Sequence, residues 1–234
     1  MRGYRTQRSC WLGLAMIAGC VLASGVARAD DSNCTGREVA HDYERKPADV
    51  LQPRQVDLVR PFTGNGKLEV NVCHGELRVQ SRADAKELRL RIETTRQPDG
   101  HAAGDFIQVF HIDPEKGLIH LKFPAEAHAM VTLIVPMGAS SNDEFNLGMG
   151  NLDFNAIGAA GRREINVGMG NMKLLVDGDK SYSSMEVNVG MGSLHDHRPG
   201  GRNGYFAVSR DFTGSGSGSM EINVGMGSLD NRQE

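Results

Sequence analysis

The sequence predicts an all-β protein whose main domain is a solenoid of short strands. Apolar and polar residues alternate in "KLEVNV" (67–72) and "ELRLRIE" (87–93), which is the period-two pattern of half-buried strands. No convincing helical periodicity follows residue 56. One eight-residue phrase also recurs at intervals near those of known solenoid repeats. Its four copies are "EFNLGMGN" (144–151), "EINVGMGN" (164–171), "EVNVGMGS" (186–193) and "EINVGMGS" (221–228).

Residues 1–29 are typical of a secretory signal peptide. Three arginines precede an apolar run, and "ARA" ends at Ala29, so we expect cleavage before Asp30. The run also contains "IAGC", which has the form of a lipobox and would leave Cys20 as a lipidated N-terminus. The apolar stretch continues past this cysteine, which favours simple secretion. The expected location is the periplasm or cell envelope, with a lipoprotein anchored through Cys20 as the alternative.

Charge restricts the class of partner. The whole chain has a formal net charge of −3. The leader holds four Arg and no Asp or Glu, so the rest has 22 Lys+Arg against 29 Asp+Glu, a formal charge of −7. Nucleic acid and anionic lipid both need a basic face, so neither is expected as the main partner. No later apolar run has the length of a spanning helix, and membrane contact is expected only through a Cys20 anchor.

The mature chain divides into a polar lead-in (30–55) and a β domain (56–234). The lead-in contains Cys34 and the domain contains Cys73, and no other cysteine follows the leader. In an exported protein an isolated pair of this kind predicts a disulfide. The alternative is two unpaired thiols.

Each copy of the repeated phrase is interpreted as a strand, a corner and a second strand. In "EINVGMGNMKLLV" (164–176) the apolar residues follow one parity up to Met169 and the other parity from Met172. Such a change indicates a bend that keeps the apolar side inward, and Met169, Met191 and Met226 are expected to fill the core under it. Glycine suits a bend because it accepts positive φ and close backbone approach. The predicted corner glycines are Gly148, Gly150, Gly168, Gly170, Gly190, Gly192, Gly225 and Gly227.

Stacking the repeats about 4.8 Å apart would align equivalent side chains in columns. A degenerate fifth copy, "EVNVCHGEL" (69–77), has Cys73 and His74 in place of Gly-Met. Asn amides can hydrogen-bond along such a stack, so the phrase is first of all scaffolding. The two expected columns are Glu144, Glu164, Glu186, Glu221 and Asn146, Asn166, Asn188, Asn223.

These motifs resemble the toast-rack family of bacterial envelope domains. The resemblance rests on "VTLIVPMGASSNDEFNLGMGNLDF" (131–154), on the Gly-Met-Gly copies that follow, and on "KLEVNVCHGELRVQ" (67–80) as the opening repeat. It covers roughly residues 56 to 229. It implies a single-sheet, right-handed β-helix-like solenoid built from roughly 20-residue strand–Gly corner–strand repeats, at the cell envelope. It transfers no catalytic residue. Gly-Met-Gly replaces the small polar residues that are more common in the family.

Two groups are candidate metal ligands. Glu164, Glu186 and Glu221 offer carboxylate oxygens that suit Ca²⁺. In "HDH", His195 and His197 would share one side of a strand and could begin a Zn²⁺ site. Zinc needs three or four ligands, however, and no partner cluster is visible. A solvated acidic face and a solvated loop are the competing interpretations, so no cofactor is expected beyond weakly bound Ca²⁺.

The sequence predicts a non-catalytic envelope protein that acts as a structural or adhesin-like interaction module, with an envelope protein or polysaccharide as its partner. Its acidic residues recur regularly, as in a structural ladder, rather than as the catalytic pair of a glycosidase. The only Trp lies in the leader, so the mature chain lacks the usual sugar-stacking platforms. A carbohydrate-active enzyme on a β-helix is one alternative. An accessory or sensor component of an envelope-stress system is another. The oligomeric state is not predicted.

Overall fold

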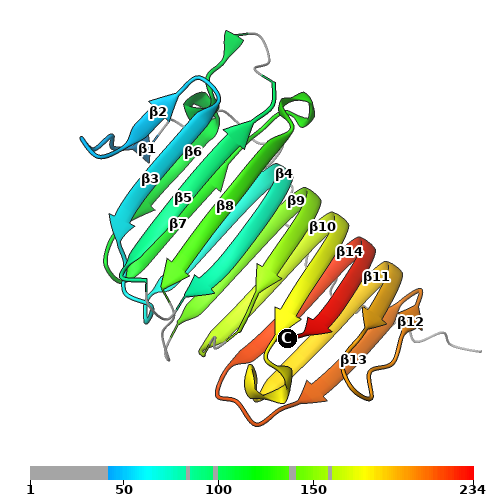
Figure 1. Ribbon diagram of the computed structural model, residues 1–234. Helices are drawn as coiled ribbons and strands as arrows, with labels where there is room; N and C mark the ends of the chain where they lie inside the picture. Colours follow the sequence, from blue (N-terminus) through cyan, green and yellow to red (C-terminus); the bar gives the residue numbers. More distant parts are fainter. Residues whose placement is uncertain (1–41, 83–84, 97–99, 137–140, 158–159) are drawn as a thin grey trace, which may run out of the picture.

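The computed structural model describes residues 42–82, 85–96, 100–136, 141–157 and 160–234, and within them the protein is all-β (Figure 1). Over the described residues, the strands belong to one 14-stranded hydrogen-bonded sheet, and three short 3₁₀ turns lie between them: η2 (Ala103–Phe106), η3 (Ala125–Ala127) and η4 (Gly178–Lys180). Across these residues no helix is both long and apolar enough to cross a membrane. The strands are β1 (Asp42–Tyr43), β2 (Val50–Gln52), β3 (Gln55–Pro61), β4 (Lys67–Arg82), β5 (Glu87–Thr94), β6 (Ile107–Ile112), β7 (Lys116–Leu121), β8 (Ala129–Pro136), β9 (Asn142–Asn155), β10 (Arg162–Val176), β11 (Ser184–Asp196), β12 (Gly204–Tyr205), β13 (Val208–Thr213) and β14 (Ser219–Gln233).

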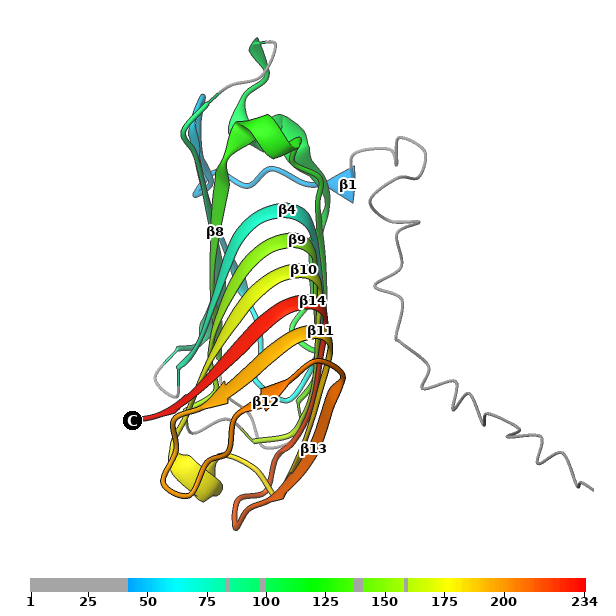
Figure 2. The ribbon, with the colours of Figure 1, turned by 90° about the vertical axis from the view of Figure 1, so that its right-hand side faces the viewer.

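Five long strands, β4, β9, β10, β14 and β11, are parallel to one another and bend in the middle (Figure 2). Their N-terminal halves form one layer of the molecule, here called the first layer. Their C-terminal halves form the facing second layer. The bends lie side by side, so the molecule has a continuous curved edge along which one layer becomes the other.

Shorter strands widen each layer at its ends. At the β4 end, β7 pairs with the first half of β4 and is followed by β6 and β1, whereas β8 pairs with the second half and is followed by β5, β3 and β2. At the β11 end, β13 pairs antiparallel with the first half of β11 and β12 with the second half. Both layers are therefore extended on both sides of the five bent strands.

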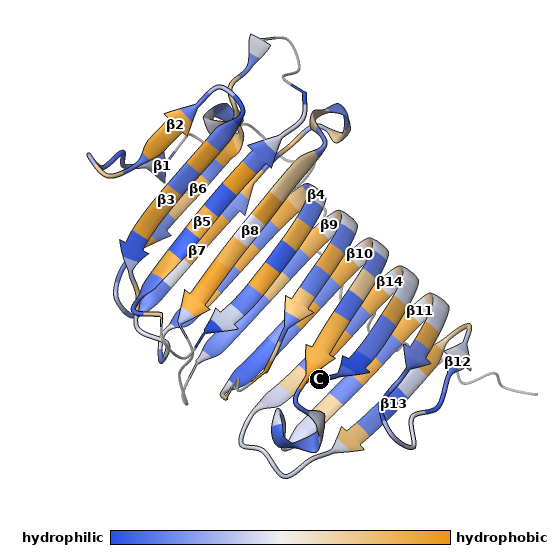
Figure 3. Cartoon of the chain, viewed as in Figure 1, coloured by the Kyte–Doolittle hydropathy of each residue, from blue (hydrophilic) through white to orange (hydrophobic). Residues whose placement is uncertain are grey.

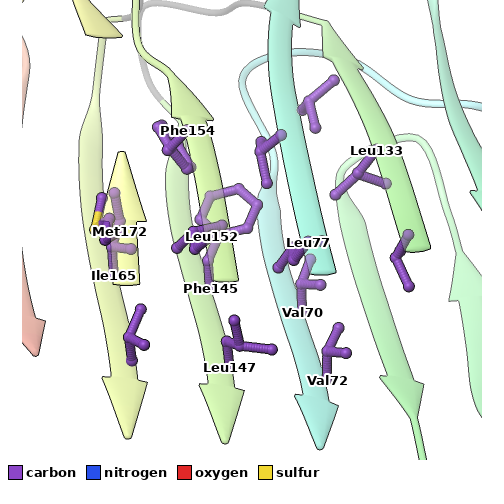
Figure 4. Close-up of a cluster of buried hydrophobic side chains, with 14 of the residues drawn as sticks. Val70, Val72, Leu77, Leu133, Phe145, Leu147, Leu152, Phe154, Ile165 and Met172 are labelled. Atoms are coloured by element: carbon purple, nitrogen blue, oxygen red, sulfur yellow. The ribbon is translucent and has the colours of Figure 1, made fainter. Parts of the chain in front are cut away.

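The core lies between the two layers. Along the long strands, hydrophobic residues alternate with hydrophilic ones (Figure 3), and the hydrophobic set is buried. Phe145 precedes the bend of β9 and Phe154 follows it, yet their ring centroids lie 5.0 Å apart in an edge-to-face contact. The two halves of one strand thus pack against each other across the core. Figure 4 shows the same arrangement for Val70 and Leu77 of β4 and for Ile165 and Met172 of β10.

The repeated copies do not stack in the order of the sequence. β14 holds the last copy and lies between β10 and β11, pairing in parallel with both. After β10 the chain passes over the neighbouring place in the sheet and forms β11 and β13. The last strand, β14, then occupies the place between β10 and β11. This arrangement differs from a solenoid whose coils follow one another in sequence.

The described part of the lead-in joins the sheet through β1 and β2. A buried ion pair fixes it: Arg60 of β3 contacts Asp49 through Nη1–Oδ1 at 2.6 Å and Nη2–Oδ2 at 2.9 Å. Burial favours the neutral carboxyl, but the bonds from Arg60 and from the Lys46 amide prevail and lower the pKa of Asp49. The signal peptide, the lipobox at Cys20, and Cys34 lie outside the described residues. Cys73 is buried in β4, and its bridge to Cys34 stays a prediction.

Candidate interaction faces

The outer face of the first layer carries a straight row of six carboxylates. The strand register aligns the Glu that opens each repeated phrase with the same Glu of the next strand, and β13 adds Asp211 opposite Glu186. With neighbouring strands about 4.8 Å apart, the row is roughly 24 Å long. We call it the carboxylate row: Glu69, Glu144, Glu164, Glu221, Glu186 and Asp211.

A column of asparagine side chains runs beside the carboxylate row and forms the predicted ladder. Asn146 Nδ2 donates to Asn71 Oδ1 at 2.8 Å, Asn166 to Asn146 at 2.9 Å, Asn223 to Asn166 at 3.0 Å, and Asn188 to Asn223 at 3.2 Å. Each Nδ2 also donates to Oε1 of the Glu two residues earlier, at 2.8–3.4 Å. One oxygen of every Glu is therefore held in place by an amide.

The ladder ends at a histidine on β7. Asn71 Nδ2 lies 2.7 Å from His120 Nε2 and 3.0 Å from Glu69 Oε1. Since Asn71 Oδ1 accepts the bond from Asn146, Nδ2 must donate both of its protons, and His120 Nε2 must accept one of them. The proton of a neutral His120 is thereby assigned to Nδ1, and all amides of the ladder point the same way.

The candidate metal ligands do not converge. Glu221 stands between Glu164 and Glu186, so the three predicted carboxylates are neighbours in the row rather than ligands around one point. His195 contacts Ser193 Oγ at 2.9 Å, and His197 contacts Asp230 at 3.2 Å. Over the described residues, no group of three or more His, Cys, Asp or Glu is arranged to hold a metal ion.

The outer face of the second layer has a different charge pattern. Along the equivalent row, Arg78 lies 3.8 Å from Asp153, and Asp153 lies 3.9 Å from Lys173. Lys173 is in register with Asp230, and Arg232 donates to that carboxylate at 2.7 Å and lowers its pKa. We call it the alternating row: Arg78, Asp153, Lys173, Asp230 and His195.

A ridge of methionines follows the bend between the two layers. Met169, Met191 and Met226 were expected to lie in the core, and the structure shows that this is wrong: they are 38%, 54% and 41% exposed, and Met149 in the same column is 41% exposed. Because the chain turns here, the strict alternation of the strand is lost and these residues point outward. His74 of β4 occupies the same column. We call this column the ridge: His74, Met149, Met169, Met226 and Met191.

The two glycines beside each methionine have different roles. The second glycine has positive φ in every copy, between 126° and 157°, and a Cβ on Gly170 would lie 1.6 Å from Gly150 O. The first glycine does not need that conformation, but a Cβ on Gly168 would lie 2.5 Å from Gly148 O. A side chain at either glycine would therefore clash with the carbonyl of the neighbouring strand at the bend.

An ion pair interrupts the apolar interior near one end of β9 and β10. Arg163 Nε lies 3.6 Å from Asp143 Oδ2, and both side chains are 3% exposed. Burial raises the pKa of Asp143 to about 6, although Arg163 and Ser141 oppose the shift. Burial also lowers the pKa of Arg163. The same inward row holds Leu68 on β4 and Met220 on β14, so the fold accepts apolar residues at this level.

A cavity of about 550 Å³ opens beside η4 at the β11 end. Arg198 is held there by Asp196 at 2.8 Å, lies 4.4 Å from the Phe212 ring centroid and donates to the hydroxyl of Tyr182. This guanidinium is already paired and stacked. Arg202 and Arg210 also line the cavity, and Arg210 donates to the carbonyl of Asn203 at 3.2 Å.

Sequence reasoning missed three elements of these faces. Asp211 belongs to no repeat, and only the pairing of β13 brings it into the carboxylate row. The alternating row was missed because its charges follow the corner, where the copies differ in sequence. The exposure of the ridge was missed because parity does not extend through a glycine bend.

No protein-family model and no curated protein matches the sequence. Among solved structures, the fold is similar to the crystal structure of a "putative cell adhesion protein" from Clostridium sporogenes ATCC 15579. The similarity has a TM-score of 0.46 and 13% sequence identity, over 77% of this chain and 100% of that chain.

Proposed function

We propose that this protein is an exported, non-catalytic envelope module that binds its partner through the carboxylate row, as an adhesin-like or structural component. The observation that supports the proposal is the row itself. Six carboxylates lie in register on the outer face of the first layer, and the Asn ladder holds five of them in fixed orientation. Such a row suits an envelope protein or polysaccharide that carries repeated cationic groups, because each group contacts one carboxylate.

The proposal also covers the toast-rack-like fold and the export of the protein to the cell envelope. The Gly-Met-Gly bends and the parallel bent strands support a toast-rack-like, β-helix-like fold in which β14 is inserted out of sequence order; its right-handed coil is what the family resemblance implies. The leader ending at Ala29 supports export. Mass spectrometry of native envelope protein should find an N-terminus at Asp30 and a Cys34–Cys73 bridge, whereas a diacylglyceryl Cys20 would show an anchored lipoprotein instead.

The binding test compares two triple variants with equal loss of charge. The first is Glu164→Gln, Glu186→Gln and Glu221→Gln in the carboxylate row. The second, the control, is Glu76→Gln, Asp153→Asn and Asp230→Asn on the outer face of the second layer. Calorimetric titration uses oligolysine, chitosan oligosaccharide and Ca²⁺ as probes. We expect the row variant to lose about ten-fold or more in affinity for the polymeric cations and the control to lose little. Single Glu186→Gln should change the affinity only slightly.

Three results would contradict the proposal. Equal losses in both triple variants would show attraction by net charge alone. An absence of binding by the wild-type protein would remove the row as an interaction face. Reducing-sugar or unsaturated product that accumulates with time and vanishes with one carboxylate substitution would identify a carbohydrate-active enzyme.

A further inference from the structure

The methionine of the ridge is the same in all four Gly-Met-Gly copies, and packing does not explain why this residue type is kept. Buried positions of the four copies vary: Phe145, Ile165, Ile222 and Val187 share one inward column. The constant Glu and Asn are explained by the ladder, and the constant glycines by backbone approach. The constant Met is exposed, so its identity is not required by the core. A repeated side chain with no packing role indicates that its chemistry is used.

The surroundings of the ridge leave its thioethers accessible. Columns of glycine flank it, with Gly148, Gly168, Gly225 and Gly190 on one side and Gly150, Gly170, Gly227 and Gly192 on the other. These residues place no side chains beside the sulfur atoms. Neighbouring methionines are about 4.8 Å apart along the ridge. Each side chain has three rotatable bonds, so adjacent sulfur atoms can turn toward one shared point.

A second observation identifies the class of ligand. At the β4 end of the ridge, the register places His74 directly beside Met149, in the position that methionine occupies in the other copies. Imidazole nitrogen and thioether sulfur together form a soft donor set. Soft donors select Cu(I) and similar monovalent ions, whereas Ca²⁺ and Mg²⁺ prefer carboxylate oxygens. A ridge that served only as an apolar docking edge would have no need for sulfur in every copy.

We propose that His74, Met149 and Met169 bind a soft monovalent cation, Cu(I), through one imidazole nitrogen and two thioether sulfurs at the β4 end of the ridge. Met226 and Met191 continue the thioether column away from this site. The site lies on the edge between the layers and uses none of the residues of the carboxylate row. It is therefore a function separate from the one proposed above.

The test measures Cu(I) affinity by competition with a chromogenic chelator under anaerobic, reducing conditions, on the chain that follows the leader. The key variant is Met149→Leu with Met169→Leu, which removes both sulfurs but keeps apolar side chains of similar volume. The matched control is Met172→Leu, which removes a buried sulfur from the same strand as Met169. We expect the double variant and His74→Gln each to lose at least about ten-fold in affinity and the control to retain wild-type affinity.

A second readout uses Ag(I), a redox-inert substitute, and methionine labelled with ¹³C at the methyl group. Ag(I) should shift the methyl signals of Met149 and Met169 and leave that of Met172 in place, and Ca²⁺ should shift none of them. No retention of Cu(I) by the wild-type protein would overturn the proposal. Equal affinity in wild type and Met149→Leu/Met169→Leu would also overturn it, because it would show adventitious metal binding. If the wild-type protein bound no Cu(I), and a protein partner bound the ridge equally well before and after Met149→Leu/Met169→Leu, the proposal would be overturned and the ridge would be an apolar docking edge.

Discussion

The two outer faces are built from the same five strands, yet they solve the problem of neighbouring charges differently. After the bend, charges alternate along Arg78, Asp153 and Lys173, which is the arrangement that stabilises adjacent strands. Before the bend, Glu144, Glu164 and the other carboxylates stand side by side. Stacked strands in this protein can therefore carry alternating charges. The like-charged row is a feature that folding does not require.

The Asn ladder explains how the first layer tolerates its row. Adjacent carboxylates about 4.8 Å apart repel by roughly 1 kcal/mol at the dielectric of water. A hydrogen bond from a neutral amide to a charged group contributes roughly 1.5–3 kcal/mol. Each Glu of the row accepts such a bond from its own strand. The ladder thus offsets the repulsion and holds the carboxylates on the surface.

The largest expected effect comes from breaking the bend that joins the two faces. Gly170→Ala would place a Cβ 1.6 Å from Gly150 O at a φ of +142°. We expect a loss of roughly 4 kcal/mol in the free energy of unfolding, measured by denaturant titration. Gly168→Ala should cost about half as much, because its Cβ would lie 2.5 Å from a carbonyl at ordinary φ.

A third glycine separates conformational strain from steric clash. Gly200 has a φ of +76°, and a Cβ at this position would have no atom within 4 Å. Gly200→Ala should therefore cost only about 1 kcal/mol. If Gly170→Ala cost no more than Gly200→Ala, close approach of the backbones would not determine the bend.

The next largest loss of stability is expected from asparagine substitutions, and it should differ between the first and second layers. Asn166 is 5% exposed, donates to Asn146 and Glu164, and accepts from Asn223. Asn166→Ala should lower stability by roughly 2 kcal/mol, since it leaves three half-buried polar partners without their bonds. On the second layer, Asn171 donates to Asn151 at 3.4 Å and accepts from Ser228 Oγ at 2.7 Å, but both bonds are exposed and water can replace them, so Asn171→Ala should cost less than about 0.5 kcal/mol. Equal costs in thermal or chemical unfolding would mean that the first-layer ladder has no special role.

The pH dependence of stability tests the buried Asp143–Arg163 ion pair between the two faces. The pKa of Asp143 is raised to about 6, above its unfolded value, so the native state binds an extra proton between roughly pH 4 and 6. Stability should therefore rise by about 1 kcal/mol as the pH falls from 7 to 5. Asp49 and Asp230, whose pKa values are lowered, lose their contribution only at more acidic pH.

The control is a variant in which Asp143 and Arg163 are replaced by the apolar residues found at the equivalent positions of neighbouring strands. Leu68 and Met220 occupy the inward row of Asp143 and Arg163, so the double variant Asp143→Leu/Arg163→Met should fold. It should be at least as stable as the wild type, because a buried ion pair is often replaceable by apolar residues. The rise between pH 7 and 5 should disappear in it. A variant that kept this rise would assign it to another group.

The sequence could predict whatever depends on the period of a strand. Alternation gave the all-β class, and identical phrases gave the Glu and Asn columns. It could not predict that β14 lies between β10 and β11, because Ile222 and Val187 fit the same inward column equally well. The position of the last strand depends instead on the β11–β13 hairpin that precedes it. The Asp143–Arg163 pair was not predictable either, since both positions appear in the sequence as polar residues just before a repeat.

The smallest expected effect has opposite signs on the two faces. Glu164→Gln keeps the oxygen that accepts the Asn166 bond but removes one charge from the middle of the carboxylate row, so stability should rise by a few tenths of a kcal/mol, roughly 0.3. Lys173→Gln removes the cation between Asp153 and Asp230, so stability should fall by about the same amount. Both differences should shrink in 1 M salt, where the Debye length is about 3 Å. Denaturant titrations at low and high salt measure them, with Asn171→Ala as the uncharged reference. If both substitutions lowered stability equally and salt had no influence, charge pattern would not distinguish the two faces, and the carboxylate row would be one more element of packing.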